Sequence, residues 1–190
     1  MRRFVCVLGF IVLLSVCYAE ENKEASKAEE SGGSRYILAF QSGFGYCGVS
    51  VVGNSEPIYT GVFGGNFMYL MPSGFTVSTD AEAIVGSIPL LGITGGLGLN
   101  LFLGYTWLFE QKHLLTVSGG VENSLTSKFI SILCVGGRLT YIFKLTDKIG
   151  IMSSGTFGLS YNGISFGEGS GFGGVMVSRI GIRVGAAFEL

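Results

Sequence analysis

Six charged residues in this chain follow a pattern that few folds can accommodate. Each lies in a stretch where every second residue is apolar or aromatic, and each falls at the alternate, more polar positions. Strands with one continuous apolar face and one polar face are typical of transmembrane β-barrels, in which lipid-facing and lumenal residues alternate. The pattern therefore predicts lumenal charges at Asp80, Glu82, Glu122, Arg138, Arg179 and Arg183.

A helical membrane protein is the main alternative fold. The stretch from Ala83 to Phe109 contains no charged residue, and about 20 apolar residues suffice to span a bilayer as a helix. Between residues 96 and 107, however, the apolar side chains recur at every second position, which is the period of a strand. Pro89 and the glycines that follow it would also weaken a helix. The stretch therefore favours strands.

Alternation of this kind divides the chain into eight segments, each near or above the ~9–11 residues that a tilted membrane strand needs. We expect strands near residues 36–46, 59–71, 75–85, 93–107, 114–122, 129–143, 149–161 and 174–190. We expect short periplasmic turns at 72–74, 110–113 and 145–148, and external loops near 47–57, 86–92, 123–128 and 162–172. The predicted fold is all-β, an eight-stranded antiparallel transmembrane up-and-down β-barrel over residues 35–190.

The N-terminus has the features of a secretory signal. Arg2 and Arg3 precede an apolar stretch, and Cys17-Tyr18-Ala19 resembles a cleavage site. We therefore predict a signal peptide over residues 1–19 and a flexible acidic periplasmic segment over residues 20–34. A retained N-terminal anchor and lipidation of Cys17 are the alternatives. Export combined with a barrel predicts the outer membrane of a double-membraned bacterium, with outer-membrane lipid around the barrel.

Composition and motifs exclude several other classes of protein. A formal net charge of −1 provides no basic field for nucleic acid. The segment Gly43–Gly48 matches G-x-G-x-x-G, but no helix start follows it, as a dinucleotide site would require. His113, the single histidine, has no cysteine near it in the sequence, which gives no support to a zinc site. We therefore predict no metal, no cofactor and no catalytic residue, and the chain is not expected to be an enzyme.

Two cysteines remain after the predicted signal peptide. Cys47 and Cys134 both have inward parity in the outer half of the predicted barrel. An exported protein can form disulfides, but these residues fall on strands that are not neighbours, and a disulfide requires Cα atoms within about 7 Å. Whether they pair stays open.

The last predicted strand alternates apolar residues up to Phe188-Glu189-Leu190. With this ending and the eight alternating segments, residues 35–190 resemble the small eight-stranded outer-membrane barrels of the OmpX and OmpW type. The glycine-rich composition and acidic leader are similar to small outer-membrane proteins of spirochaetes such as treponemes. The resemblance implies that Phe188 and Leu190 form the signal read by the barrel-assembly machinery, although Leu190 replaces the usual terminal Phe.

Two functions are compatible with this barrel. An OmpW-like protein would be a narrow channel for passive uptake of small hydrophobic molecules, which enter from outside and leave sideways into the bilayer. The alternative is a structural or host-interaction barrel, an adhesin or surface antigen, whose charges plug the lumen and whose external loops contact host ligands. Eight strands leave room for little more than side chains. The apolar residues predicted to line the lumen are Ile37, Val62, Met68, Ile84, Phe102, Ile132 and Met152.

Overall fold

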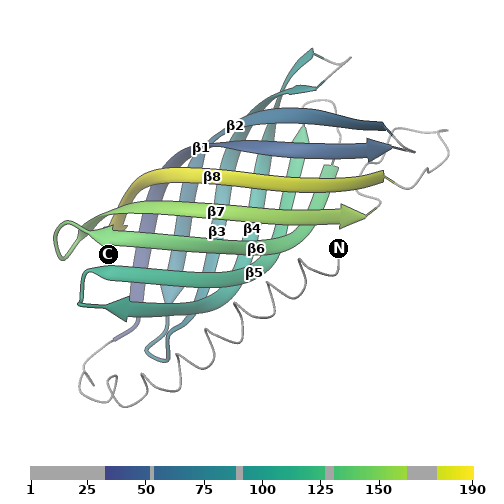
Figure 1. Ribbon diagram of the computed structural model, residues 1–190. Coiled ribbons are helices and arrows are strands. Elements are labelled where there is room, and N and C mark those ends of the chain that lie inside the picture. The colour runs from purple at the N-terminus through teal and green to yellow at the C-terminus, as the bar shows by residue number, and fades with distance from the viewer. Residues whose placement is uncertain (1–32, 52–53, 89–91, 127–130, 162–174) are drawn as a thin grey trace. The chain divides into compact units, whose positions relative to one another are not determined.

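The computed structural model of the chain contains a closed barrel of eight antiparallel strands (Figure 1). It describes residues 33–51, 54–88, 92–126, 131–161 and 175–190. The predicted signal peptide, and nearly all of the predicted acidic segment, lie outside these residues. The strands are β1 (Arg35–Val51), β2 (Asn54–Leu70), β3 (Phe75–Ile88), β4 (Gly92–Phe109), β5 (His113–Thr126), β6 (Ser131–Lys144), β7 (Ile149–Tyr161) and β8 (Val175–Glu189).

The strands follow one another around the barrel in chain order, and β1 closes the sheet by pairing with β8. The prediction of an all-β barrel with eight antiparallel strands is therefore confirmed. Among the described residues, no helix combines the length and apolarity needed to cross a membrane.

Burial alternates along each strand as the sequence pattern predicts. On β4, Phe102 is fully buried, whereas its neighbours Leu101 and Leu103 are 47% and 50% exposed. Successive side chains of a strand point to opposite faces of a sheet, so one set fills the barrel and the other covers its outside. The outside is consequently apolar over most of its surface, and the polar residues are collected inside.

The strands are longer at one end of the barrel than the sequence predicts. β1 and β2 remain paired up to Val51 and Asn54, so most of the expected loop near 47–57 is a two-stranded ladder. β3 reaches Ile88 and β5 reaches Thr126, which shortens the next two expected loops as well. Glycine, serine and proline in these segments resemble turn signals, but a hairpin can continue its backbone pairing through them. The expected loop near 162–172 lies outside the described residues.

The three predicted short connections all lie at the other end of the barrel, which we call the turn end. In the connection from β2 to β3, the amide of Gly74 donates to the carbonyl of Met71 at 2.9 Å, and Gly74 has a φ of +85°. A turn followed by a glycine with positive φ is typical of a type I turn with a G1 bulge. Pro72 stands where such a turn favours proline.

Inward-facing glycines allow neighbouring strands to bend closely around a narrow lumen. A Cβ at Gly136 of β6 would fall against the carbonyl oxygen of Phe157 on β7. A Cβ at Gly120 of β5 would fall against the carbonyl oxygen of Leu101 on β4 in the same way. Glycine in a strand often marks such a bend or close approach. The narrow lumen that results brings side chains from opposite walls into contact.

Substitution of Gly74 should destabilise the barrel. In Gly74→Ala, the new Cβ would occupy a conformation that side chains rarely adopt and would lie 2.6 Å from the ring of Tyr105. We expect a loss of about 1–3 kcal/mol in the free energy of unfolding, measured by urea unfolding of the refolded protein in lipid vesicles. Gly155→Ala is the control, because nothing lies within 4 Å of its new Cβ. Equal stability of the two variants would contradict this account of the turn.

Candidate functional site

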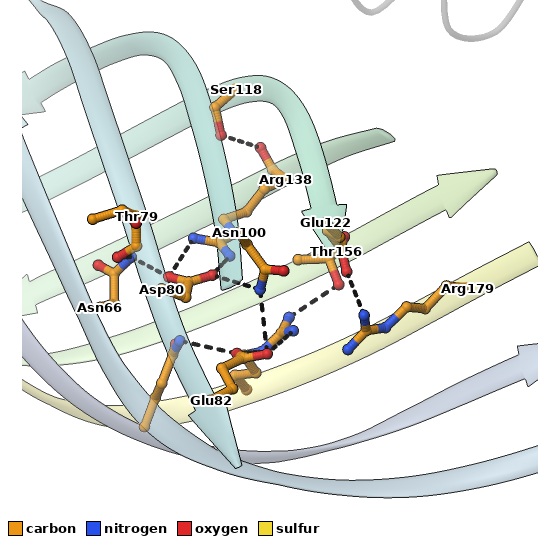
Figure 2. Close-up of polar contacts among 12 residues, drawn as sticks. Asn66, Thr79, Asp80, Glu82, Asn100, Ser118, Glu122, Arg138, Thr156 and Arg179 are labelled. Atoms are coloured by element: carbon orange, nitrogen blue, oxygen red, sulfur yellow. Dashed lines mark hydrogen bonds and ion pairs between the residues drawn. The ribbon is translucent and has the colours of Figure 1, made fainter. Parts of the chain in front are cut away.

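Three ion pairs cross the lumen between strands that are not neighbours (Figure 2). Asp80 and Glu82 of β3 pair with Arg138 of β6 and Arg183 of β8, and Glu122 of β5 pairs with Arg179 of β8. All six residues are buried. We call this set the ion-pair layer: Asp80, Glu82, Glu122, Arg138, Arg179 and Arg183.

The pair between Asp80 and Arg138 is bidentate. One guanidinium nitrogen of Arg138 donates to Oδ1 of Asp80 at 3.0 Å, and the other donates to Oδ2. The amides of Asn66 and Asn100 donate to the same carboxylate at 2.5 and 3.2 Å. The guanidinium also lies over the ring of Phe102, 3.9 Å from its centroid. Asp80 therefore has a donor on each side, as a buried carboxylate requires.

The pair between Glu82 and Arg183 is equally well supported. Nε of Arg183 lies 2.5 Å from Oε1 of Glu82, and Nη2 donates to Oε2 at 3.0 Å. Asn100 donates to Oε2 at 3.3 Å. Nη1 of Arg183 donates to the hydroxyl of Thr156 on β7 at 3.0 Å. This pair thus ties β3 to β7 and β8 across the lumen.

The third pair is less complete. Nη1 of Arg179 lies 3.2 Å from Oε2 of Glu122, but the geometry does not make a hydrogen bond to either carboxylate oxygen. The same nitrogen donates to Ser124 at 2.9 Å. The side chain of Arg179 is 9% exposed, more than that of either other arginine in the layer. Arg179 is therefore the member of the layer nearest to open space.

The register explains why these residues meet. Asn66, Asp80, Asn100 and Glu122 are direct partners on consecutive strands from β2 to β5, so they form one row on the inner wall. Arginines from β6 and β8 extend across the lumen to this row. An unpaired charge in such a site would keep a large desolvation cost, which explains why three acids are matched by three arginines.

The residues predicted to line the lumen separate into two groups. Ile37, Met68 and Met152 belong to a buried cluster at the turn end that we call the apolar plug, and Phe102 packs beneath Arg138. Val62 and Ile84, which are register partners, lie on the other side of the ion-pair layer. The side chain of Ile132 is not among those that the structure describes. The complete plug is Ile37, Ala39, Met68, Leu70, Leu114, Ile142, Met152 and Ala187.

The plug has a polar neighbour whose hydrogen bonds sequence reasoning missed, although alternation places Thr76 inward. The hydroxyls of Thr76, Thr106 and Thr116 form a hydrogen-bonded row across β3, β4 and β5, with distances of 2.6 and 2.7 Å. Leu114 and Ile142 of the plug were missed as well. Inward parity alone could have identified all five, because each alternates with outward apolar residues.

The two cysteines and Phe188 are the next candidate residues, and none of them belongs to the ion-pair layer. Cys47 and Cys134 are buried free thiols whose register partners are Arg179 and Glu122. Phe188 is on the outside, where its ring contacts that of Phe40 edge-on at 6.4 Å. Among the described residues, no group of three or more metal-binding side chains of the histidine, cysteine or acidic type comes together.

The C-terminal end of the last strand and the histidine both lie at the turn end. The amide of Leu190 donates to the carbonyl of Tyr36 at 2.9 Å, which anchors the last residue beside β1. His113 begins β5, and its Nδ1 is 2.6 Å from the hydroxyl of Tyr141. This contact gives His113 a structural partner on β6.

Comparison with known proteins identifies the fold. No protein-family model and no curated protein sequence matches the chain. Among solved structures, Neisserial surface protein A matches with a TM-score of 0.57 at 9% identity, over 84% of this chain and 100% of that one. AlkL in DMPC bilayers matches with 0.53 at 13% identity (85% and 93%), and OprG from Pseudomonas aeruginosa with 0.51 at 12% identity (83% and 96%).

These three structures are outer-membrane or surface proteins by name. At such low identities, the likeness establishes that this chain has the fold of small eight-stranded outer-membrane barrels. The resemblance inferred from the alternating pattern is therefore confirmed at the level of the fold, while the similarity to spirochaete proteins stays a prediction.

Removing one member of a buried ion pair should destabilise the barrel strongly. Asp80→Asn leaves the charge of Arg138 buried without a partner, which costs about 3–5 kcal/mol in the free energy of unfolding. The double variant Asp80→Asn with Arg138→Met should lose less, because no unpaired charge remains. Both are measured by urea unfolding in lipid vesicles.

The control is Arg35→Gln, which removes a partly exposed ion pair with Glu189 at the turn end, 3.7 Å long. Exposed pairs contribute about 0–1 kcal/mol. If Asp80→Asn were as mild as this control, the ion-pair layer would not be the electrostatically matched unit described above.

Proposed function

We propose that this chain is a bacterial outer-membrane barrel with a closed lumen, and that it acts as a structural or surface-interaction protein and not as a water-filled pore. The observation that carries the proposal is the filling of the lumen at two successive levels. The ion-pair layer crosses it from wall to wall, and the apolar plug fills the turn end. A solute would have to separate matched buried charges to pass.

The outward surface supports the membrane location. Exposed apolar side chains cover the outside of every strand. An apolar surface of this extent is unfavourable in water and is typical of contact with lipid. Aromatic rings gather at the turn end, where Tyr36 stacks on Tyr69 and Tyr105 packs beside Trp107. Tyrosine and tryptophan favour the interface between membrane and water.

The partners of such a barrel follow from its surface and its terminus. Outer-membrane lipid would cover the apolar outside, and the barrel-assembly machinery would read the last strand through Phe188 and Leu190. Host ligands would be bound by the connections at the end opposite the turn end. The acidic segment before β1 would extend into the periplasm after removal of the signal peptide.

A second candidate function is passive uptake of small hydrophobic molecules. It is favoured by the lining on the far side of the ion-pair layer from the plug, where Ile58, Val62 and Val177 are buried and point inward. A solute that used only this half would have to leave sideways between strands, because the layer blocks the way onward.

Electrical recording separates a closed barrel from a pore. We expect the refolded barrel in planar lipid bilayers to show no steady conductance in 1 M salt, because ions cannot pass the ion-pair layer and the plug. The same preparation must show heat-modifiable gel mobility, which proves that the inserted protein is folded. A stable, protein-dependent conductance would overturn the closed-lumen proposal.

A binding assay tests the uptake candidate. If hydrophobic molecules enter the half that contains Val62, Val62→Thr should weaken binding of a fluorescent fatty-acid probe about fivefold, because an apolar solute would leave the new hydroxyl without a partner. Val121→Thr, on the outward face, is the control. Equal binding by wild type and both variants would remove this candidate.

A further inference from the structure

Glu189 lies at the point where the sheet closes on itself. It is the last residue of β8, and its register partner on β1 is Ile37. Its Oε2 lies 2.5 Å from Nζ of Lys144, and its Oε1 lies 3.7 Å from Nε of Arg35. Lys144 is the last residue of β6, and Arg35 is the first residue of β1. One carboxylate therefore joins the ends of three strands, including the first and the last strand of the chain.

These three charged residues point into the mouth of the barrel at the turn end. Each stands two positions beyond a member of the apolar plug on its own strand, and residues two apart in a strand share a face. We call this set the closing latch: Arg35, Lys144 and Glu189. On β7, the register partner of Lys144 is Gly150. Because Gly150 has no side chain, the ammonium group of Lys144 can reach across β7 to Glu189 on β8.

The closing latch differs from the ion-pair layer in its contact with water. The side chains of Lys144, Glu189 and Arg35 are 14%, 21% and 34% exposed, whereas those of the layer are at most 9% exposed. Buried ion pairs carry a large desolvation cost unless their hydrogen bonds are complete, but partly exposed charges keep contact with water and attract each other at little cost. The pairs of the latch can therefore form while the lumen is still open, before those of the layer.

The backbone alone does not fix the register in which β8 meets β1. The amide of Leu190 donates to the carbonyl of Tyr36 at 2.9 Å, but ladder bonds of this kind form in any register of two strands. A slip by one residue would turn the apolar face of β8 inward, whereas a slip by two residues keeps every side chain on its own face. A slip by two would move Glu189 about 7 Å along the strand, out of reach of Arg35.

We propose that the closing latch is a folding device. Glu189 is captured by Lys144 and Arg35 while the sheet is still open, and this capture guides β8 onto β1 in the observed register. The ion-pair layer then forms inside the closed lumen. The latch thus accelerates closure of the barrel and contributes little to its final stability. The proposal holds equally for a surface-interaction barrel and for an uptake barrel.

The folding rate of Glu189→Gln tests the closing latch. We expect this variant to fold into lipid vesicles roughly fivefold more slowly than the wild type, because two partly exposed ion pairs are lost. Its unfolding rate in urea should stay within about twofold of the wild type, since contacts already formed in the transition state act on the folding rate. Folding is followed by the heat-modifiable band on gels of unheated samples. A loss confined to the unfolding rate would overturn the proposal, because the pairs would then form only after closure.

Reversal of all three charges separates ion pairing from the loss of one side chain. The triple variant Arg35→Glu, Lys144→Glu and Glu189→Lys again places one charge between two opposite charges. We expect it to fold at a rate close to that of the wild type and faster than Glu189→Gln. If the triple variant folded as slowly as Glu189→Gln, charge pairing would not be the cause and the latch would be rejected.

Asp147→Asn is the matched control, because it removes one negative charge from an exposed position in the connection between β6 and β7. This variant should fold at the wild-type rate. Salt provides an independent measurement, since about 1 M salt screens exposed charges. The ratio of the wild-type folding rate to that of Glu189→Gln should then fall toward one. An unchanged ratio in salt, or equal slowing by Asp147→Asn, would contradict an electrostatic latch at Glu189.

Discussion

The matching of charge inside a narrow closed sheet is the constraint on which the rest of this structure depends. Six ionised side chains share a lumen only wide enough for side chains, where each one without a partner would cost several kcal/mol. The structure meets this requirement by pairing residues from opposite walls. The ion pairs therefore act as cross-links as well as neutralising partners, and they hold β3 and β5 against β6 and β8.

Closure of the sheet is the second constraint, and it supports the first. A barrel satisfies the backbone hydrogen bonds of every strand without leaving an edge, which a bilayer requires. Inward glycines such as Gly120 and Gly136 let the strands bend tightly enough to close. A wider barrel would separate Asp80 from Arg138, so the glycines of the wall and the charges of the lumen depend on each other.

The lumen is divided into unlike parts along its length. The turn end is filled by apolar side chains and a row of threonine hydroxyls. The ion-pair layer follows, with two fully bonded pairs and one incomplete pair on the side of β5 and β8. Beyond it, small and apolar residues such as Cys47 and Val62 line the wall. Arg179 of the incomplete pair has the most exposed side chain of the layer, whereas Glu122 is fully buried.

The sequence by itself determined the fold class, the number of strands and the inward position of all six charges, because alternation with period two can be read without knowing which strands meet. The sequence did not determine which acid pairs with which arginine. That Asp80 pairs with Arg138 while Glu82 pairs with Arg183 depends on barrel radius and register, which join residues 58 and 101 positions apart. The same holds for the apolar plug, whose members come from six strands. The extent of the hairpin between β1 and β2 was also mispredicted, because backbone pairing between strands overrides local turn signals. Only the closed structure shows that Glu122 and Arg179 form an ion pair without a hydrogen bond, since this depends on which side chains can reach one another across the lumen.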